Sequence, residues 1–131
     1  MTSPHRSAPI IDDQTQAFWT GGAVGELRIA RCGSCDLWLH PPRPICHRCQ
    51  SADITPQAVS GRGTVWSFTI NRYKWSPGLE PPYVIAQVEL EEQPGLLLLT
   101  TIVDCDEVRI GMPVRVRFEQ AGDAWIPVFA P

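Results

Sequence analysis

The chain of 131 residues is long enough for one compact unit or two small ones. Hydrophobic residues make up 44% and charged residues 19%, which excludes wholesale disorder, and the formal net charge of −3 argues against a dedicated nucleic-acid binder. No stretch approaches the roughly 20 apolar residues that span a bilayer, and the start lacks the apolar segment of a signal peptide. We therefore expect a cytoplasmic protein with no membrane partner, in whose reducing compartment paired cysteines bind metal more often than they form disulfides.

The first segment, residues 1–25, is predicted to form an N-terminal arm and a short helix. Asp12 or Asp13 would cap this helix, and Gly21-Gly22 would end it. Phe18 and Trp19 need burial, so we expect the helix to dock on the rest of the chain or on a partner. Residues 26–31 alternate between apolar and polar side chains and predict a strand that leads into the first cysteine pair.

Four paired cysteines dominate the next segment, residues 26–59, which we interpret as a zinc ribbon. Cys32-Gly33-Ser34-Cys35 and Cys46-His47-Arg48-Cys49 are separated by ten residues. Each CxxC pair presents two thiolates, and two pairs complete a closed tetrahedral site with no position for water. Cys32, Cys35, Cys46 and Cys49 therefore predict a structural Zn²⁺ rather than a catalytic one; iron would use the same four sulfurs. His40 and His47 are alternative ligands nearby, but four sulfurs already suffice.

The last segment, residues 60–131, reads as all-β. Strands are expected at 64–73, 83–90, 96–103, 114–119 and 125–129, a spacing that favours a five-stranded OB-type barrel. Alternation along the first strand places Trp66, Phe68 and Ile70 on one face, with Trp66 in the barrel core. Residues 96–103 are nearly all apolar, as in a strand buried on both faces, and the connection 104–113 is expected to hold one helical turn that ends at Gly111.

No residues typical of an active site are apparent, so the chain by itself is not expected to be an enzyme. No serine lies in a nucleophile elbow, and Gly61-Arg62-Gly63 is too short for a phosphate loop and precedes a strand. Arginines of the ribbon suit phosphates or carboxylates, and the aromatic residues around one loop suit a partner contact. The candidate partner or ligand contacts are Phe18, Trp19, Arg43, Arg62, Arg72, Tyr73, Trp75 and Tyr83.

A series of short motifs runs over residues 18–129. It consists of Phe18-Trp19, the two CxxC pairs, Pro41-Pro42-Arg43-Pro44, Gly61-Arg62-Gly63-Thr64-Val65, Pro81-Pro82-Tyr83-Val84, Ile110-Gly111-Met112-Pro113-Val114 and Pro127-Val128-Phe129. CxxC pairs alone are common, but this series in this order resembles the DUF35 family, a rubredoxin-like zinc ribbon followed by an OB-fold. His47 is a departure, because the family often has proline there; the ligands stay intact.

The resemblance implies a non-catalytic accessory subunit that binds and stabilises a thiolase-fold enzyme acting on acyl-CoA thioesters. A retro-aldolase of steroid side-chain breakdown is the specific case, in a heterotetramer or larger assembly, with a MaoC-type hydratase as a further partner and acyl-CoA as a further contact. Two alternatives stay open. One is a stand-alone acyl-CoA-binding module; the other is an OB-fold that binds single-stranded nucleic acid, which six basic against ten acidic residues from residue 51 onward disfavour.

Overall fold

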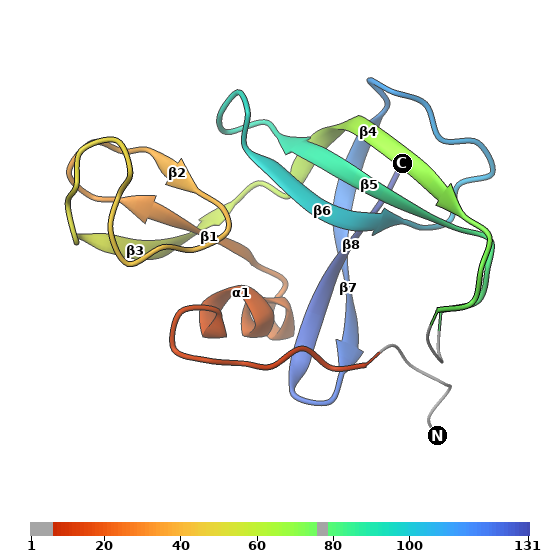
Figure 1. Ribbon diagram of the computed structural model, residues 1–131, viewed down its shortest axis with the longest axis horizontal. Helices are drawn as coiled ribbons and strands as arrows, with labels where there is room; N and C mark the ends of the chain where they lie inside the picture. Colours follow the sequence, from red (N-terminus) through yellow and green to blue (C-terminus); the bar gives the residue numbers. More distant parts are fainter. Residues whose placement is uncertain (1–6, 76–78) are drawn as a thin grey trace.

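The computed structural model describes residues 7–75 and 79–131, in which a ribbon sheet and a barrel follow one another along the chain and a short N-terminal helix lies beside both (Figure 1). The predicted class is confirmed: mainly β, with an N-terminal helix, a cysteine ribbon and a closed five-stranded barrel of OB type. The elements are α1 (Gln16–Thr20), the 3-10 helix η1 (Gly21–Val24), β1 (Leu27–Cys32), β2 (Trp38–Leu39), β3 (Ile54–Val59), β4 (Arg62–Asn71), β5 (Tyr83–Leu90), β6 (Leu97–Ile102), β7 (Pro113–Ala121) and β8 (Ala124–Ala130). No described helix is long and apolar enough to span a membrane.

The barrel closes in the order β4-β5-β6-β8-β7. Its neighbours are antiparallel except β6 and β8, which meet in parallel through the single pair Ile102 and Phe129. Side chains alternate along each strand, so Val65, Val88 and Val114 point inward and are at most 2% exposed. This interior forms the greater part of the hydrophobic core.

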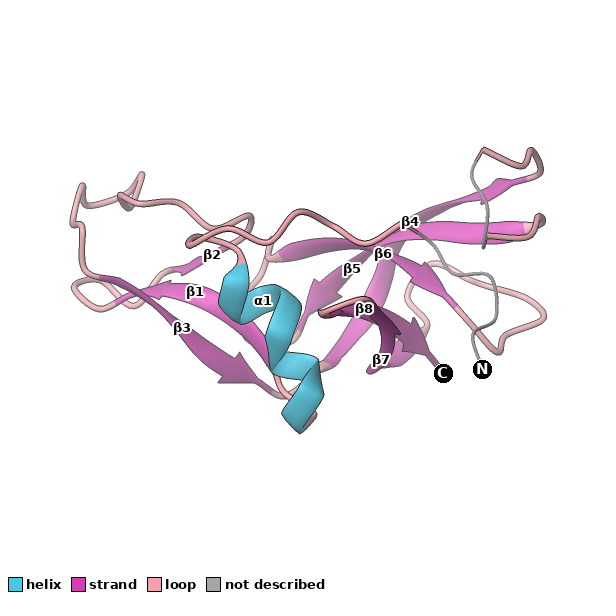
Figure 2. Ribbon diagram, turned by 90° about the horizontal axis from the view of Figure 1, so that it is seen from below, coloured by secondary structure: helices cyan, strands magenta, loops and turns pink. Residues whose placement is uncertain are grey.

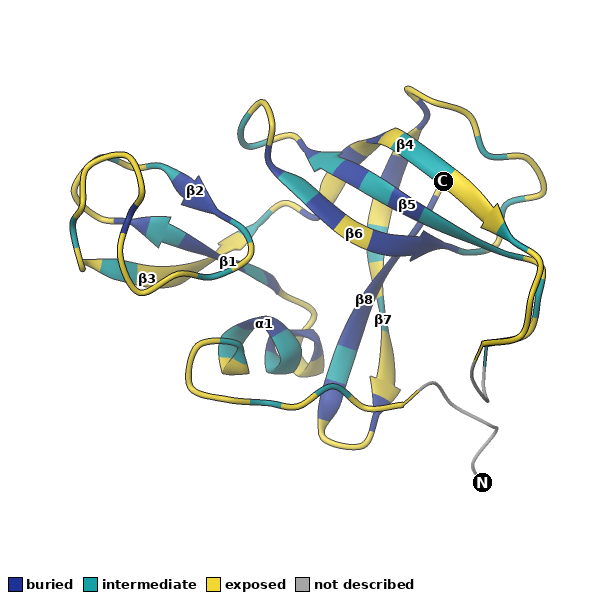
Figure 3. Cartoon of the chain, in the orientation of Figure 1, coloured by how far each residue is buried: buried dark blue, intermediate teal, exposed yellow. Residues whose placement is uncertain are grey.

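Strand β1 has one face toward the barrel core and the other toward the cysteines, and so it joins the ribbon to the barrel. Leu27 and Ile29 are 1% exposed and belong to the same core cluster as the barrel residues, together with Phe129. Ala30 and Cys32 belong to a second, smaller cluster around the cysteines. The ribbon sheet, in the order β2-β1-β3, therefore packs on the barrel through one face of its central strand (Figure 3).

The β5–β6 hairpin contacts the ribbon through one amide side chain. Gln93 Oε1 accepts from the Trp38 backbone N–H at 3.0 Å, and Gln93 Nε2 donates to the Trp38 carbonyl at 3.1 Å. The Trp38 ring is 8% exposed and lies under the Arg31 guanidinium, 4.5 Å from its centroid. The barrel thus satisfies both backbone groups of Trp38, and this fixes the edge strand β2 against it.

The N-terminal helix lies against β1 and β8, between ribbon and barrel (Figure 2). Asp12 does not cap it: its carboxylate accepts from the backbone N–H groups of Gln14 and Thr15 in the preceding turn, and the helix begins at Gln16. Phe18 is 8% exposed within the core. Gly22 allows η1 to approach the barrel, since a Cβ there would lie 2.5 Å from Phe118 Cδ1.

Three details of the barrel differ from the sequence prediction. Trp66 is 52% exposed, because Val65 before it points into the barrel and Trp66 therefore points outward; the β-bulge between Val65 and Ser67 then brings Phe68, and not Trp66, against the core. Leu99 is 68% exposed, so β6 is not buried on both faces. The connection before β7 holds turns and bends but no helical turn at Gly111, which has φ +87°.

Candidate metal centre

Two knuckles of matching geometry form the cysteine site. In the first, the Asp36 N–H donates to the Cys32 carbonyl at 2.9 Å; in the second, the Gln50 N–H donates to the Cys46 carbonyl at 2.8 Å. The residue after each second cysteine is left-handed, Asp36 at φ 65° and Gln50 at φ 61°. Asp tolerates this left-handed conformation, and the tight turns aim both sulfurs of a knuckle the same way.

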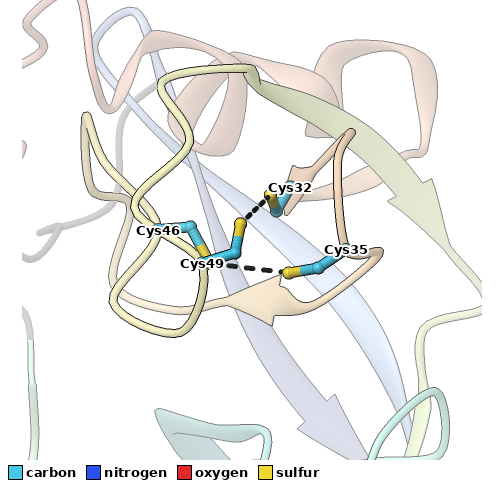
Figure 4. A group of neighbouring side chains, drawn as sticks. All are labelled: Cys32, Cys35, Cys46 and Cys49. Carbon is cyan, nitrogen blue, oxygen red and sulfur yellow. Dashed lines mark hydrogen bonds between the residues drawn. The ribbon is translucent and has the colours of Figure 1, made fainter.

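The four sulfurs converge on one point between the knuckles (Figure 4). Their Sγ atoms all lie within 4.8 Å of one another, with Cys32–Cys49 at 3.5 Å and Cys35–Cys46 at 3.7 Å. A tetrahedral ion with Zn–S bonds of about 2.3 Å requires sulfurs roughly 3.8 Å apart. The ligand set that the spacing predicts is therefore assembled at a distance that fits a four-sulfur metal site, and the residues fit a structural ion.

The negative charge that the four thiolates would carry also favours binding of a cation. The Leu37 backbone N–H, aided by Arg48, lowers the pKa of Cys35 to about 6. The pKa of Cys49 moves the other way, to about 12: the Ser51 N–H favours its thiolate, but burial and the neighbouring sulfurs oppose it more strongly. Four thiolates this close cannot all carry negative charge without a positive ion among them.

Hydrogen bonds and close packing fix the residues around the site. Arg48 donates to the Cys35 carbonyl at 2.7 Å, and its backbone N–H points to Cys46 Sγ at 3.4 Å. Gly33 packs closely against the Asp53 side chain: a Cβ there would lie 2.3 Å from Asp53 Oδ2, so Asp53 would have to move. His40 and His47 are outside the group of converging ligands: His40 stacks on the Phe18 ring at 5.0 Å, and His47 is exposed.

The remaining candidate contact residues do not form one site. Phe18 is buried in the core and Trp19 is half-buried beside it, so both pack α1 onto this chain. Arg43 is exposed beside a cleft of about 310 Å³ between α1 and the ribbon. Arg62 is paired with Glu91 at 3.1 Å.

The aromatic loop after β4 does bring residues together. Tyr73 and Trp75 are 63% and 72% exposed, and their rings lie 4.6 Å apart. Arg72 is exposed next to them, and Tyr83 is half-buried opposite Asn71 on β5. Sequence reasoning missed Trp38, Gln93 and the exposure of Trp66; only a knowledge of strand register reveals them.

Among residues 7–75 and 79–131, the four cysteines are the only group of three or more His, Cys, Asp or Glu side chains placed to share a metal ion. A closed shell of four sulfurs holds an ion but leaves it no position for substrate or water. What the arrangement does chemically is therefore to stabilise the ribbon.

Known proteins share this architecture. The chain matches the ChsH2 rubredoxin-like zinc ribbon domain over residues 19–55 and the ChsH2 C-terminal OB-fold domain over residues 56–119. It is 38% identical over 130 residues to a probable enoyl-CoA hydratase alpha subunit of Thermomonospora curvata. It is 40% identical over 125 residues to the 3-oxo-4,17-pregnadiene-20-carboxyl-CoA hydratase alpha subunit of Mycobacterium tuberculosis. These alignments cover 96% and 91% of this chain but only 40% and 39% of the two relatives, so the chain spans well under half of their length.

Shorter relatives and solved structures agree. A DUF35 domain-containing scaffold protein of Pyrococcus furiosus is 42% identical over 80 residues, which is 60% of this chain and 58% of that protein. A chain of the Ltp2-ChsH2(DUF35) aldolase superposes with a TM-score of 0.84 at 34% identity, over 95% of this chain and 98% of that one. A DUF35 protein of Sulfolobus solfataricus shares the fold at 19% identity and a TM-score of 0.62, over 90% and 84% of the two chains. The chain therefore belongs to the DUF35 family, as a ChsH2-type zinc ribbon joined to an OB-fold.

Proposed function

We propose that this chain is the non-catalytic scaffold subunit of a two-component enzyme whose catalytic chain is a thiolase-fold protein acting on acyl-CoA thioesters. The observation that carries the proposal is the match to a chain of the Ltp2-ChsH2(DUF35) aldolase, which extends over 95% of this chain at 34% identity. We further propose that the reaction is cleavage of a carbon–carbon bond in an acyl-CoA, such as that of a steroid side chain, and that the complex acts in the cytoplasm.

The residues of this chain support a scaffold rather than a catalyst. The described acidic, histidine and cysteine side chains converge only at the closed four-sulfur site. Most ribbon arginines are engaged within the chain: Arg28 pairs with Glu26, Arg31 lies over Trp38, and Arg48 bonds the Cys35 carbonyl. The function of the chain therefore lies in its surface, whose shape the metal-stabilised ribbon maintains. We take the ion to be zinc, as the ribbon's family description states.

The longer relatives suggest a second partner. Both are named hydratase alpha subunits, and this chain aligns with only 40% and 39% of their length. We propose that a MaoC-type hydratase works in the same assembly, either joined to this chain or beside it, so that hydration and cleavage of one acyl-CoA follow each other. A heterotetramer or larger assembly is the expected form.

Affinity purification of the tagged chain from its own cells, followed by mass spectrometry, tests the proposal. We expect a thiolase-fold enzyme to co-purify. Co-expression should then raise that enzyme's soluble yield and its acyl-CoA cleavage activity, and a Cys32→Ser chain should not. If no thiolase-fold protein co-purifies, or if the enzyme is equally stable and active alone, the proposal is wrong.

A second candidate function, acyl-CoA binding by the chain alone, is favoured by one cavity. A pocket of about 600 Å³ opens beside β4, β5 and β7, and its lining residues include Leu90, Pro94, Val114, Arg62 and Arg115. Arginine suits phosphate, but Glu91 already neutralises Arg62. Calorimetric titration of the isolated chain with acetyl-CoA and a long-chain acyl-CoA decides: absence of heat rejects this candidate.

A further inference from the structure

Strand β4 has an edge that the barrel leaves open. On the side away from β5, β7 pairs only with Arg62–Thr64. The Val65 N–H then donates to the Met112 carbonyl at 3.0 Å, and the Val65 carbonyl accepts from the Gly111 N–H at 2.8 Å. Beyond this point, no described strand or loop is hydrogen-bonded to the backbone of Trp66–Asn71 on that side.

The register identifies the backbone groups at this edge. In an antiparallel ladder, the N–H and C=O of one residue point to the same side, and successive residues alternate. Val65 faces away from β5, as its bonds to Gly111 and Met112 require. The extra residue Trp66 then shifts the alternation, because Thr64 pairs with Glu89 and Ser67 with Gln87. Phe68 and Ile70 therefore direct their N–H and C=O groups to the open edge.

Nothing on this strand protects the edge. Exposed edges are ordinarily guarded by lysine, inward charges or proline, since a bare edge pairs with any extended chain. Residues Gly63–Asn71 contain no charged residue and no proline. Thr69 and Ile70 are exposed, and the far end of β4 appears as a solvent-facing stretch in Figure 3. The backbone donors and acceptors along this edge are therefore exposed and available to pair with another strand.

Aromatic side chains mark both ends of this edge. Trp66, the extra residue of the bulge, is exposed at one end. At the other end, Trp75 Nε1 donates to Asn71 Oδ1 at 2.8 Å while its ring contacts Tyr73 at 4.6 Å. An exposed ring held by a hydrogen bond, as Trp75 is, loses little conformational freedom on binding, which is typical of interface anchors.

We propose that the Trp66–Asn71 edge of β4 accepts an extended, uncharged segment of the catalytic partner chain as an additional strand. The inference rests on the proposed function and assigns its docking surface. Backbone donors and acceptors repeating every second residue recognise another strand and not a small molecule. The occupant is a different protein rather than a second copy, because the matching aldolase pairs this kind of chain with Ltp2. Because this strand carries no charge, neutral side chains on the added strand suit it best.

Hydrogen exchange of the wild-type complex tests the strand directly. The probe is the thiolase-fold enzyme that co-purifies with the chain. We expect the amides of Phe68 and Ile70 to exchange quickly in the free chain and at least about tenfold more slowly in the complex. The amides of Ser67 and Thr69, which bond β5, should be slow in both states and act as the internal control.

A pair of variants separates backbone pairing from side-chain contact. Ile70→Pro removes an edge N–H without touching the β5 ladder, and Ile70→Ala removes the same side chain but keeps that N–H. We expect Ile70→Pro to weaken partner binding roughly tenfold or more relative to Ile70→Ala, measured by surface plasmon resonance. If Ile70→Pro fails to fold, the exchange of the wild-type amides decides alone.

The outcomes are distinct. If no thiolase-fold enzyme co-purifies, both the function and the docking surface are rejected. If the enzyme binds but the Phe68 and Ile70 amides stay fast, or if the two Ile70 variants bind equally, only the docking surface is rejected. If the free chain dimerises and these amides are already slow without the enzyme, the edge joins two copies of this chain and the proposal is overturned.

Discussion

The His40 imidazole should make the stability of this protein fall in mild acid. Its ring stacks on Phe18 at 5.0 Å, and its Nδ1 is buried without a hydrogen-bond partner. Burial lowers the pKa of His40 from 6.5 to about 4, because the charged form would lose its hydration. Between these values the unfolded chain binds a proton at His40 that the folded chain does not. The contribution of His40 to the free energy of unfolding is therefore lost as the pH falls from about 6.5 to about 4, and this contribution changes no further below pH 4.

The size of the effect follows from that interval. Each pH unit across it contributes about 1.4 kcal/mol, so His40 accounts for at most about 3 kcal/mol of unfolding free energy between neutral pH and pH 4. Such a loss is a large fraction of the stability of a small domain. The acid sensitivity of the metal thiolates adds to it, because protonation competes with the ion.

Urea unfolding at several pH values, followed by tryptophan fluorescence, separates the two causes. Wild type is compared with His40→Phe, which keeps a ring against Phe18 but cannot titrate. Both chains share the metal site, so the difference in their pH slopes belongs to His40. We expect wild type to lose about 3 kcal/mol more than the variant on going from pH 7 to pH 4. Parallel curves would refute the reasoning.

Three further substitutions test the metal site and the contacts that hold the ribbon and the 3-10 helix against the barrel. Cys32→Ser should release the ion and unfold the ribbon, a loss on the order of 10 kcal/mol of binding free energy, seen by metal analysis and by proton spectra; native-like ribbon signals without metal would contradict this. Gln93→Ala removes both hydrogen bonds to the Trp38 backbone and should lower the free energy of unfolding by about 2 kcal/mol in urea titration, whereas an unchanged midpoint would show that packing alone holds β2. Gly22→Ala places a Cβ 2.5 Å from Phe118 Cδ1 and should cost about 1–3 kcal/mol by thermal melting; a variant as stable as wild type would mean that η1 moves freely.

Cysteine spacing and strand alternation predict much of this fold from sequence. Two CxxC pairs specify a shared ion because the tight knuckle is a local structure, and the Asp36 and Gln50 turns confirm that locality. The barrel strands are predictable because inward side chains must be apolar at every second position, as with Val88 and Val114.

What the sequence does not predict depends on pairing between distant segments. Trp66 and Phe68 sit in an alternating apolar run, and only the register against β5 reveals the bulge that puts them on different faces. Strand β3 contains Pro56 and mostly exposed side chains, so it has no hydrophobic pattern and exists through its ladder with β1. The contact between Gln93 and Trp38 joins residues 55 positions apart and leaves no local signal.

The two faces of β1 give the metal an influence beyond its own ligands. Cys32 belongs to the four-sulfur site, while Leu27 and Ile29, on the same strand, belong to the barrel core. The short β2 strand repeats the arrangement, since Leu39 packs beside the cysteines and Trp38 is held by Gln93. We therefore expect loss of the ion to disturb the core side chains that β1 and β2 supply to the barrel, as well as to unfold the knuckles.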